Sequence, residues 1–534
     1  MISFKGISQL LHVYKRVPSF SIKYSNRIFM TTLQRLYNEF KCMTGFLVLL
    51  FNSILLYSQP VVFTGPQGLQ ASSEYEVRVN GEKNFVYHSP VPAAYCSFDM
   101  MGPVDVVIKA NRDIKWVDIR PRSAGIDVRF EDSTIYLHLK KPQQLSIELN
   151  GSIKTPLFLF ANAPEINRPA KNDKNVIFFE AGKIHYPGTI NLKSNQTVYI
   201  EGGAVVVGVI SAKGARNIKI LGRGVLDGTY NNRFNDTVVR KAGKDTSLLR
   251  SMKGSYHRFI ELIDCSEVTI EGITLHNSTS WQVVPINCTN VQINNIKIIS
   301  DQASDDGIDV VRSRRVSINN CFIRTKDDNV VIKAHLDYPK SSAVDSVEVT
   351  NSIFWNALWG NSIEIGFELN ASEIKNIIFR NIDIIHVEAG AAISIHNAGS
   401  GTVKNVVFEN IRIEDARQKL FDFAIFRSMY SEDGTRNPEE RKRLYLNGAW
   451  DGVLMVPADQ MAYHAQYRGQ VQDILLKNIY LTDGIFPYSV FYGFDIQHPI
   501  KNVIIDNLVV HGKKIETLSA ARLYQENTQN IMLK

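Results

Sequence analysis

Two clusters of aspartates carry the residue types in this chain that could do chemistry. The first is Ser304-Asp305-Asp306-Gly307-Ile308-Asp309, and the second is Lys326-Asp327-Asp328-Asn329. Crowded carboxylates repel each other, so one holds its proton while another stays ionised. Such a pair can protonate the leaving oxygen of a glycosidic bond and activate water. The other interpretations are a Ca²⁺ site, or acids solvated at turns.

The chemistry depends on whether the two clusters meet in space. Asp306 and Asp327 are 21 residues apart. If this interval is one turn of a coiled β-structure, Asp306, Asp327 and Asp328 come to neighbouring positions on one face. A repeat of that kind must therefore be present around them.

The chain does repeat, in units of a short β-branched run, a Gly or Asn pivot, and a second apolar alternation. Period-2 alternation of Val and Ile indicates strands, and units of this length are typical of a solenoid. A right-handed parallel β-helix fits best, and the alternative is a β-sandwich rich in Val and Ile. The last-but-one interval, of 68 residues, is one insertion or a coil whose pattern is lost. The pivots are Gly272, Asn295, Asn320, Asn351, Asn381, Asn410, Asn478 and Asn507.

Counting from the pivots predicts one vertical patch. Asp306 lies 11 residues after Asn295, and Asp327 and Asp328 lie 7 and 8 after Asn320. Stacked coils are roughly 4.8 Å apart. Asn361 and His396 follow their own pivots at similar distances, so the same patch should include them.

The fold class expected is therefore all-β, a right-handed parallel β-helix preceded by a small antiparallel β-sandwich. Residues 60–165 carry hairpin signals at Asn80-Gly81 and Asn150-Gly151 and form the predicted sandwich, which could cap the open end of the helix. Residues 166–534 form the predicted catalytic β-helix. An insertion at about 421–470, rich in charge and aromatic residues, is predicted to cover one end of a cleft.

Residues 1–59 are predicted to be a leader with a signal peptide. Phe46 to Tyr57 is apolar but shorter than the roughly 20 residues a spanning helix needs. The protein is thus expected to be secreted, periplasmic or on the cell surface, with no stable membrane insertion after the leader is removed; a retained anchor is the alternative. The leader holds +6 of the net charge of +7, so the rest gives little support to nucleic-acid binding.

We expect no cofactor and no metal, and the cysteines do not indicate a metal site. Cys265 and Cys288 are 23 residues apart and should stack on adjacent coils, as buried thiols or as a disulfide. Cys321 should lie in the core, and no cysteine spacing suggests a zinc site.

The aspartate motifs resemble a known family. Asp306-Gly307-Ile308-Asp309, then Thr325 to Asn329 and Ile332-Lys333, resemble the active-site coils of glycoside hydrolase family 28, the polygalacturonases, over roughly residues 175–515. The resemblance implies that Asp327 is the general acid. It also implies that Asp306 and Asp328 share the nucleophilic water, with inversion at the anomeric carbon.

Departures from the family pattern bear on the substrate. Asn361 stands where the family has His, and Ser394-Ile395-His396 stands where it has the Arg-Ile-Lys that grips a galacturonate carboxylate. Glu364 and Glu368 lie nearby. Without cations a uronate is poorly bound, so a neutral, α-linked, non-galacturonan glycan is expected. Families 49 (dextranases, isopullulanases) and 110 are also similar; a pectin-cleaving polygalacturonase is the alternative.

The predicted substrate-binding residues surround the acids. Trp281 and Trp359 could stack sugar rings, and Asn361, Glu364 and His396 could bond hydroxyls, although each tryptophan could equally be core and His396 structural. Lys333 could hold an aspartate ionised. Two further functions stay open: a Ca²⁺-dependent polysaccharide lyase, with Lys333 as a candidate base, and a non-catalytic glycan-binding protein.

Overall fold

The computed structural model describes residues 59–88, 93–228, 258–278, 280–335, 343–434, 439 and 452–534. The expected leader, apart from Gln59, lies outside these ranges, and so does Cys42. Within them, no helix has the length and apolar character that a membrane span requires.

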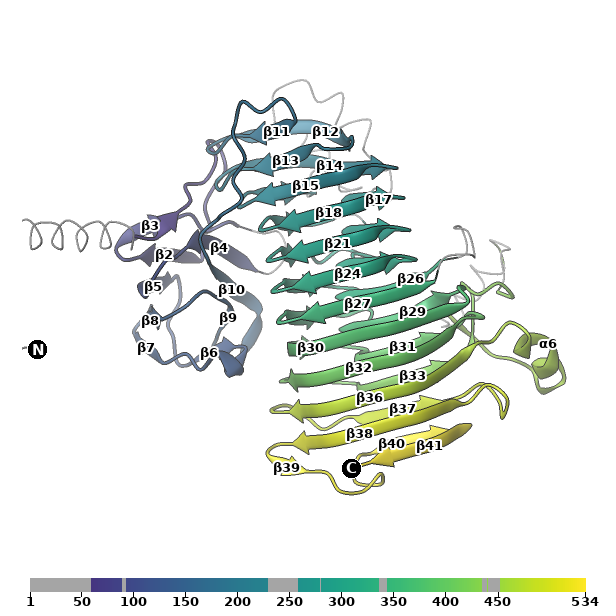
Figure 1. Cartoon of the computed structure of the whole chain (residues 1–534). Coiled ribbons are helices and arrows are strands. Elements are labelled where there is room, and N and C mark those ends of the chain that lie inside the picture. Colours follow the sequence, from purple (N-terminus) through teal and green to yellow (C-terminus); the bar gives the residue numbers. More distant parts are fainter. Residues whose placement is uncertain are drawn as a thin grey trace, which may run out of the picture. The chain divides into compact units, whose positions relative to one another are not determined.

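A parallel sheet of 29 strands winds from Val176 to Leu533 and forms the predicted right-handed β-helix (Figure 1). Its strands fall into three walls, because each strand pairs with one in the next coil. What we call the first wall leads up to the pivots, which follow the shorter strands directly and lie inside β30, β32, β36 and β38. It consists of β11 (Val176–Phe179), β13 (Thr197–Ile200), β15 (Arg216–Gly222), β18 (Ser266–Glu271), β21 (Thr289–Asn294), β24 (Arg314–Asn319), β27 (Val344–Thr350), the first parts of β30 (Glu373–Val387), β32 (Thr402–Ile413), β36 (Gln470–Leu481) and β38 (Ile500–Val510), and β41 (Thr528–Leu533).

The second wall follows the pivots, and the third closes each coil. The second consists of β16 (Val225–Asp227), β19 (Thr274–His276), β22 (Lys297–Ile299), β25 (Phe322–Thr325), β28 (Ile353–Asn356) and the later halves of β30, β32, β36 and β38. β12 (Ile184–Leu192) and β14 (Val205–Lys213) begin in the second wall and end in the third. The rest of the third wall consists of β17 (Ile260–Ile263), β20 (Val283–Ile286), β23 (Ile308–Val311), β26 (Val330–Ala334), β29 (Ile363–Leu369), β31 (Ala391–Asn397), β33 (Lys419–Ile425), β37 (Tyr488–Tyr492) and β40 (Leu523–Glu526). A short strand, β39 (Lys513–Lys514), turns back on β38.

The pivots adopt the left-handed backbone that Asn and Gly tolerate. Asn295 has a φ of 54° and Asn410 one of 55°. Their amides form a ladder from coil to coil, in which Asn410 donates to Asn381 and Asn478 donates to Asn410 at 2.9 Å. The residues that open the repeats pair in register and bury their side chains: Val268, Val291, Val316, Val347, Ile377, Val406, Ile474 and Val503.

The 68-residue interval is one insertion, because β36 pairs directly with β32. Phe421, near the start of the predicted insertion, lies in β33 of the third wall and packs in the core. The bounds of about 421–470 stay a prediction. The described part of the insertion includes β34 (Arg427–Ser428), β35 (Val453–Leu454), η4 (Ala458–Gln460) and α6 (Met461–Ala465). Residues 435–438 and 440–451 lie outside the description, so the predicted cleft cover stays a prediction.

The strands before the β-helix form two five-stranded sheets, and the fold class that includes a sandwich is confirmed. One sheet contains β1 (Val61–Val62), β4 (Ala94–Asp99), β10 (Ser152–Asn162), β9 (Gln143–Leu149) and β6 (Val117–Arg120). The other contains β3 (Glu82–Asn84), β2 (Tyr75–Val79), β5 (Val104–Ala110), β8 (Thr134–Leu139) and β7 (Val128–Glu131), and η2 (Arg122–Ala124) follows β6.

The sequence had suggested that the sandwich caps the open end of the helix, but the sandwich packs elsewhere. Its sheet that contains β10 packs along the second wall, where Phe158 lies 4.8 Å from Phe322 and 5.8 Å from Trp355 between ring centroids. Arg120 reaches Glu414, several coils further on. The apolar rows of β10 and the second wall bury each other, so the contact runs across the coils.

The four cysteines in the described ranges, Cys96, Cys265, Cys288 and Cys321, are free and buried. Cys265 and Cys288 are thus stacked thiols rather than a disulfide, and Cys321 lies in the core.

Candidate functional site

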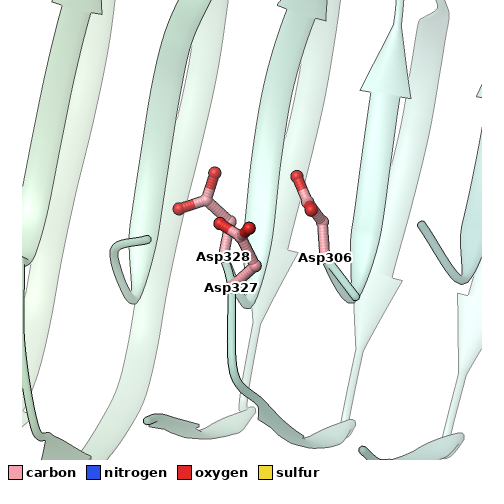
Figure 2. Close-up of side chains that lie close together, drawn as sticks. All are labelled: Asp306, Asp327 and Asp328. Atoms are coloured by element: carbon pink, nitrogen blue, oxygen red, sulfur yellow. The ribbon is translucent and has the colours of Figure 1, made fainter. Parts of the chain in front are cut away.

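Adjacent coils of the third wall bring Asp306, Asp327 and Asp328 together. Asp306 comes just before β23 and the other two come just before β26, and these strands pair from Ile308↔Val330 onward. One carboxylate oxygen from each lies within 4.8 Å of the others (Figure 2). The 21-residue interval is therefore one coil.

A buried lysine neutralises part of this negative charge. The Nζ of Lys333 lies 3.1 Å from Oδ2 of Asp306 and 3.4 Å from Oδ1 of Asp309. Burial acts to lower the pKa of Lys333, but the charges of Asp306 and Asp309 outweigh it and raise the pKa well above its usual value. Lys333 is consequently an ammonium ion.

The acids outnumber this cation, and their pKa values move accordingly. Burial raises the pKa of Asp327 and of Asp328, and the charge of Asp306 raises both further. Asp309, fully buried behind them, has its pKa raised for the same two reasons. The cluster therefore retains protons at a pH where isolated aspartates are ionised.

Asp327 and Asp328 have different surroundings. Oδ1 of Asp328 accepts a hydrogen bond from the backbone N–H of Asn361 at 2.6 Å, and that bond favours its ionised form. Asp327 is less buried. Gly360 leaves the two carboxylates room, because a Cβ there would approach Oδ1 of Asp327 to 2.5 Å and Oδ1 of Asp328 to 2.6 Å.

The turn that carries Asp327 is held by its neighbours on both sides. Asn356 of the next coil donates to the carbonyl of Asp327 at 2.5 Å. In the preceding coil, Oδ1 of the fully buried Asp305 accepts from the N–H groups of Lys326 and Asp327 at 2.9 and 3.0 Å. Burial raises the pKa of Asp305 to about 6. Asp305 was part of the quoted motif, but sequence reasoning gave it no role; its position next to Asp306 was the available signal.

Further along the third wall, His396 lies between two carboxylates. Its Nδ1 is 2.9 Å from Oε2 of Glu364, and its Nε2 is 3.2 Å from Oδ2 of Asp422. Burial opposes its protonation, but Glu364 and Asp422 prevail and raise the pKa of His396 to about 10. Both ring nitrogens are thus already bonded to protein, which fits the structural interpretation of His396 better than the hydroxyl-binding one.

The neighbours of His396 complete this cluster. Glu364 also accepts from Nδ2 of Asn361 at 2.9 Å and from the hydroxyl of Ser394. Asp422 also pairs with Lys419. Asp422 was missed because the sequence assigned it to the insertion, where its strand pattern went unread.

The tryptophans differ from one another. Lys333 and Arg258 lie over the ring of Trp281, 4.0 and 4.8 Å from its centroid, so protein cations already occupy that ring. Trp359 is 50% exposed, but Lys326 lies over its ring, 4.6 Å from the centroid, so a protein cation covers one face of this ring as well. Trp355 is buried against the sandwich.

A divalent cation would find donor atoms in the same three aspartates, which form a possible ligand group within the described part of the chain. The Lys333 ammonium already neutralises Asp306, however, which weakens that set as a metal site.

Comparison with known proteins agrees with the motifs. The model of glycosyl hydrolases family 28 matches residues 165–421, a little under half of the chain. A polygalacturonase of Juniperus ashei is 27% identical over 218 residues, which cover 38% of this chain and 38% of the relative. An exopolygalacturonase B of Aspergillus niger is 26% identical over 220 residues, with 38% of this chain and 45% of the relative covered. The chain thus matches less than half the length of these relatives.

Among solved structures, Dex49A from Penicillium minioluteum covers 88% of this chain and 96% of its own, at 15% identity and a TM-score of 0.57. That likeness concerns the fold alone. The resemblance to polygalacturonase-like β-helix glycoside hydrolases is confirmed, and residues 165–421 carry it in sequence.

Proposed function

We propose that this protein is a glycoside hydrolase that cleaves O-glycosidic bonds of a polysaccharide or oligosaccharide by aspartate acid/base catalysis. One observation carries the proposal: Asp306, Asp327 and Asp328 each place an oxygen within 4.8 Å of the others, and Lys333 pairs with only one of the three. The family match over residues 165–421 supports the same chemistry.

Asp327 is proposed as the general acid. Its pKa is raised well above its usual value by burial and by the charge of Asp306, which favours the protonated form that a general acid needs. It is also the least buried of the three, which lets it meet a leaving oxygen and exchange protons with solvent. A positioned general acid of this kind is worth about 10²–10⁴ in rate.

Asp306 and Asp328 are proposed to hold and deprotonate the attacking water. Each has a donor that favours its anion, Lys333 for Asp306 and the N–H of Asn361 for Asp328. We propose inversion, as the family resemblance implies. Carboxyl groups of inverting enzymes usually stand about 6.5–9.5 Å apart, whereas the nearest oxygens here are closer, so the anomer of the product is a direct test.

The substrate we propose is a neutral glycan. Where the family has Arg and Lys, this chain has Ser394 and His396, and both are engaged by Glu364. The positive charge of His396 is offset by Glu364 and Asp422, so this described position offers a uronate carboxylate no free cationic fork. A hydroxyl-rich ring makes no such demand.

Polygalacturonan is the second candidate, because the curated relatives are named polygalacturonases. We also propose that the protein acts outside the cytoplasm, which follows from the expected leader and needs a test of its own by mass spectrometry of the exported chain's N-terminus.

The decisive experiment is a panel of dextran, pullulan and polygalacturonate incubated with the full-length protein, with reducing ends and product anomers followed by NMR. Release from a neutral polymer, with the inverted anomer first, supports the proposal. Release from polygalacturonate alone selects the second candidate. Glycan binding without any product between about pH 4 and 8 would refute the hydrolase and indicate a binding protein.

A further inference from the structure

The third wall continues past the candidate site with side chains in register. Glu364 pairs with Ser394, Ser394 with Asp422, Asp422 with Val490, and Val490 with Tyr524. His396 likewise leads through Ala424 to Tyr492. Alternate residues of a strand face the same side. The face that carries Glu364 and His396 therefore extends without a gap onto β37 and β40 (Figure 1).

Three tyrosines lie exposed on this extension. Tyr488 is 67% exposed, Tyr492 37% and Tyr524 54%, while Phe491 between them points into the core. Tyr488 is the register partner of Lys419, which pairs with Asp422. Exposed aromatic rings grouped on one face are a feature of ligand-binding surfaces.

Polar groups accompany these rings. The hydroxyl of Tyr524 donates to Glu526, whose strand position is beside Tyr492. Arg522 lies 5.8 Å from the ring centroid of Tyr488. Flat apolar faces beside hydrogen-bonding groups of both signs suit a pyranose, which presents C–H groups on its faces and hydroxyls at its edge.

We propose that Tyr488, Tyr492 and Tyr524 form a remote subsite for the same polysaccharide chain that the aspartates cleave. From β26, which follows Asp327 and Asp328, to β37 is four coils, or about 19 Å. A glycan of several units spans that distance. The inference rests on the proposed function for the identity of the chain, and on continuity of the third wall for its path.

If the remote subsite exists, it should raise kcat/KM for long substrates and leave kcat/KM for short substrates unchanged. The variant Tyr492→Ala/Tyr524→Ala should lose roughly tenfold in kcat/KM on the polymer that the panel identifies. On a di- or trisaccharide of the same linkage it should stay within about twofold of the unchanged protein. Trp116→Ala, which removes a ring 56% exposed on the sandwich, is the matched control and should alter neither value.

A second readout separates this inference from the proposed function. Affinity electrophoresis of Asp327→Asn in gels that contain dextran, pullulan or polygalacturonate should show retardation that disappears when Tyr492 and Tyr524 are also replaced. That result stands even if no polymer is cleaved. Equal losses on long and short substrates, or unchanged retardation, would overturn the subsite. A change in sedimentation coefficient with the tyrosine variant would instead assign the surface to contact with a second copy.

Discussion

Two clusters of buried acids differ in the direction in which most of their pKa values move. At the contact with the sandwich, Arg120 bonds Asp118, Glu148 and Glu414, while His386 lies between Glu148 and Asp415. Burial opposes ionisation there, but His386 prevails and lowers the pKa of Glu148, and with Arg417 it lowers that of Asp415 to about 2. At the candidate site, Asp306, Asp309, Asp327 and Asp328 share Lys333, and the last three have raised pKa values.

The difference lies in charge balance rather than in burial. Near the sandwich the charges are almost matched, and Glu414, whose pKa burial raises despite Arg120, is the exception. At the site they are left unmatched, which costs stability and keeps a proton available. Uncompensated charge of this kind is typical of groups that act on a substrate. The predictions below test the balanced cluster at the sandwich and the crowded acids at the candidate site.

The largest effect is expected from Asp327→Asn. The amide cannot donate an acidic proton, so turnover should fall about 10³-fold or more, while removal of one crowded acid should leave the unfolding temperature equal or higher. Steady-state rates and thermal unfolding measure the two. Asp127→Asn, at an exposed position of the sandwich, is the control. Wild-type turnover in Asp327→Asn would show that Asp327 is not the general acid.

Breaking the balanced cluster should have the opposite effect: lower stability with unchanged turnover. Arg120→Ala leaves Glu414 buried without its cation and leaves Glu148 with His386 alone, so we expect a loss of about 3–5 kcal/mol in the free energy of unfolding. Turnover per folded molecule should hold, because the cluster lies on the second wall and the aspartates on the third. Urea unfolding and an active-fraction assay test this; a stable variant with lost turnover would contradict it.

The pH dependence of stability should differ in sign between the regions. Asp415 has a pKa lowered to about 2 in the fold, so its stabilisation is present above its unfolded value of about 3.9 and is lost as pH falls towards 2. Asp305 has a pKa raised to about 6, so the fold is favoured below about 3.9 and loses stability as pH rises through 6.

Urea unfolding of Asp415→Asn and Asp305→Asn against the unchanged protein measures both slopes. The deficit of Asp415→Asn should grow between about pH 2 and 4, and the relative stability of Asp305→Asn should rise between about pH 4 and 6. Slopes of the same sign in the two variants would show that the regions do not differ in charge balance.

The smallest effect is expected from metal removal. Lys333 already pairs with Asp306 and Asp309, so a chelator should leave turnover within about twofold of the untreated rate. Restoration of lost activity by Ca²⁺ after chelation would favour the lyase and count against the hydrolase.

Much of the β-helix could be predicted because its signal is local and repeated. The Asn pivots indicate a left-handed backbone at the same place in each coil. Val268 and the other residues that open the repeats indicate which side chains face the core. From those two patterns the register of the first wall follows. The boundaries chosen for the sandwich and the catalytic domain remain predictions.

The site was harder to predict, because coil-to-coil contacts are not written in the order of residues. Asp305 supports the turn of Asp327 from the preceding coil, and Asp422 meets His396 from the following one. Neither pairing has a motif. The place of the sandwich was mispredicted for the same reason: its hairpins are visible in sequence, but the wall it covers is chosen by Phe158, Phe322 and Trp355 together.

The amino-acid sequence by itself determined that coils stack at intervals of about one repeat and that Asp306, Asp327 and Asp328 return to one face. Period-2 patterning and left-handed pivots act within a few residues, so they can be read along the chain. Only the tertiary structure decided which acids are neutralised and which are left crowded. That outcome depends on burial and on charges from other coils, since an electrostatic environment is a property of neighbours in space.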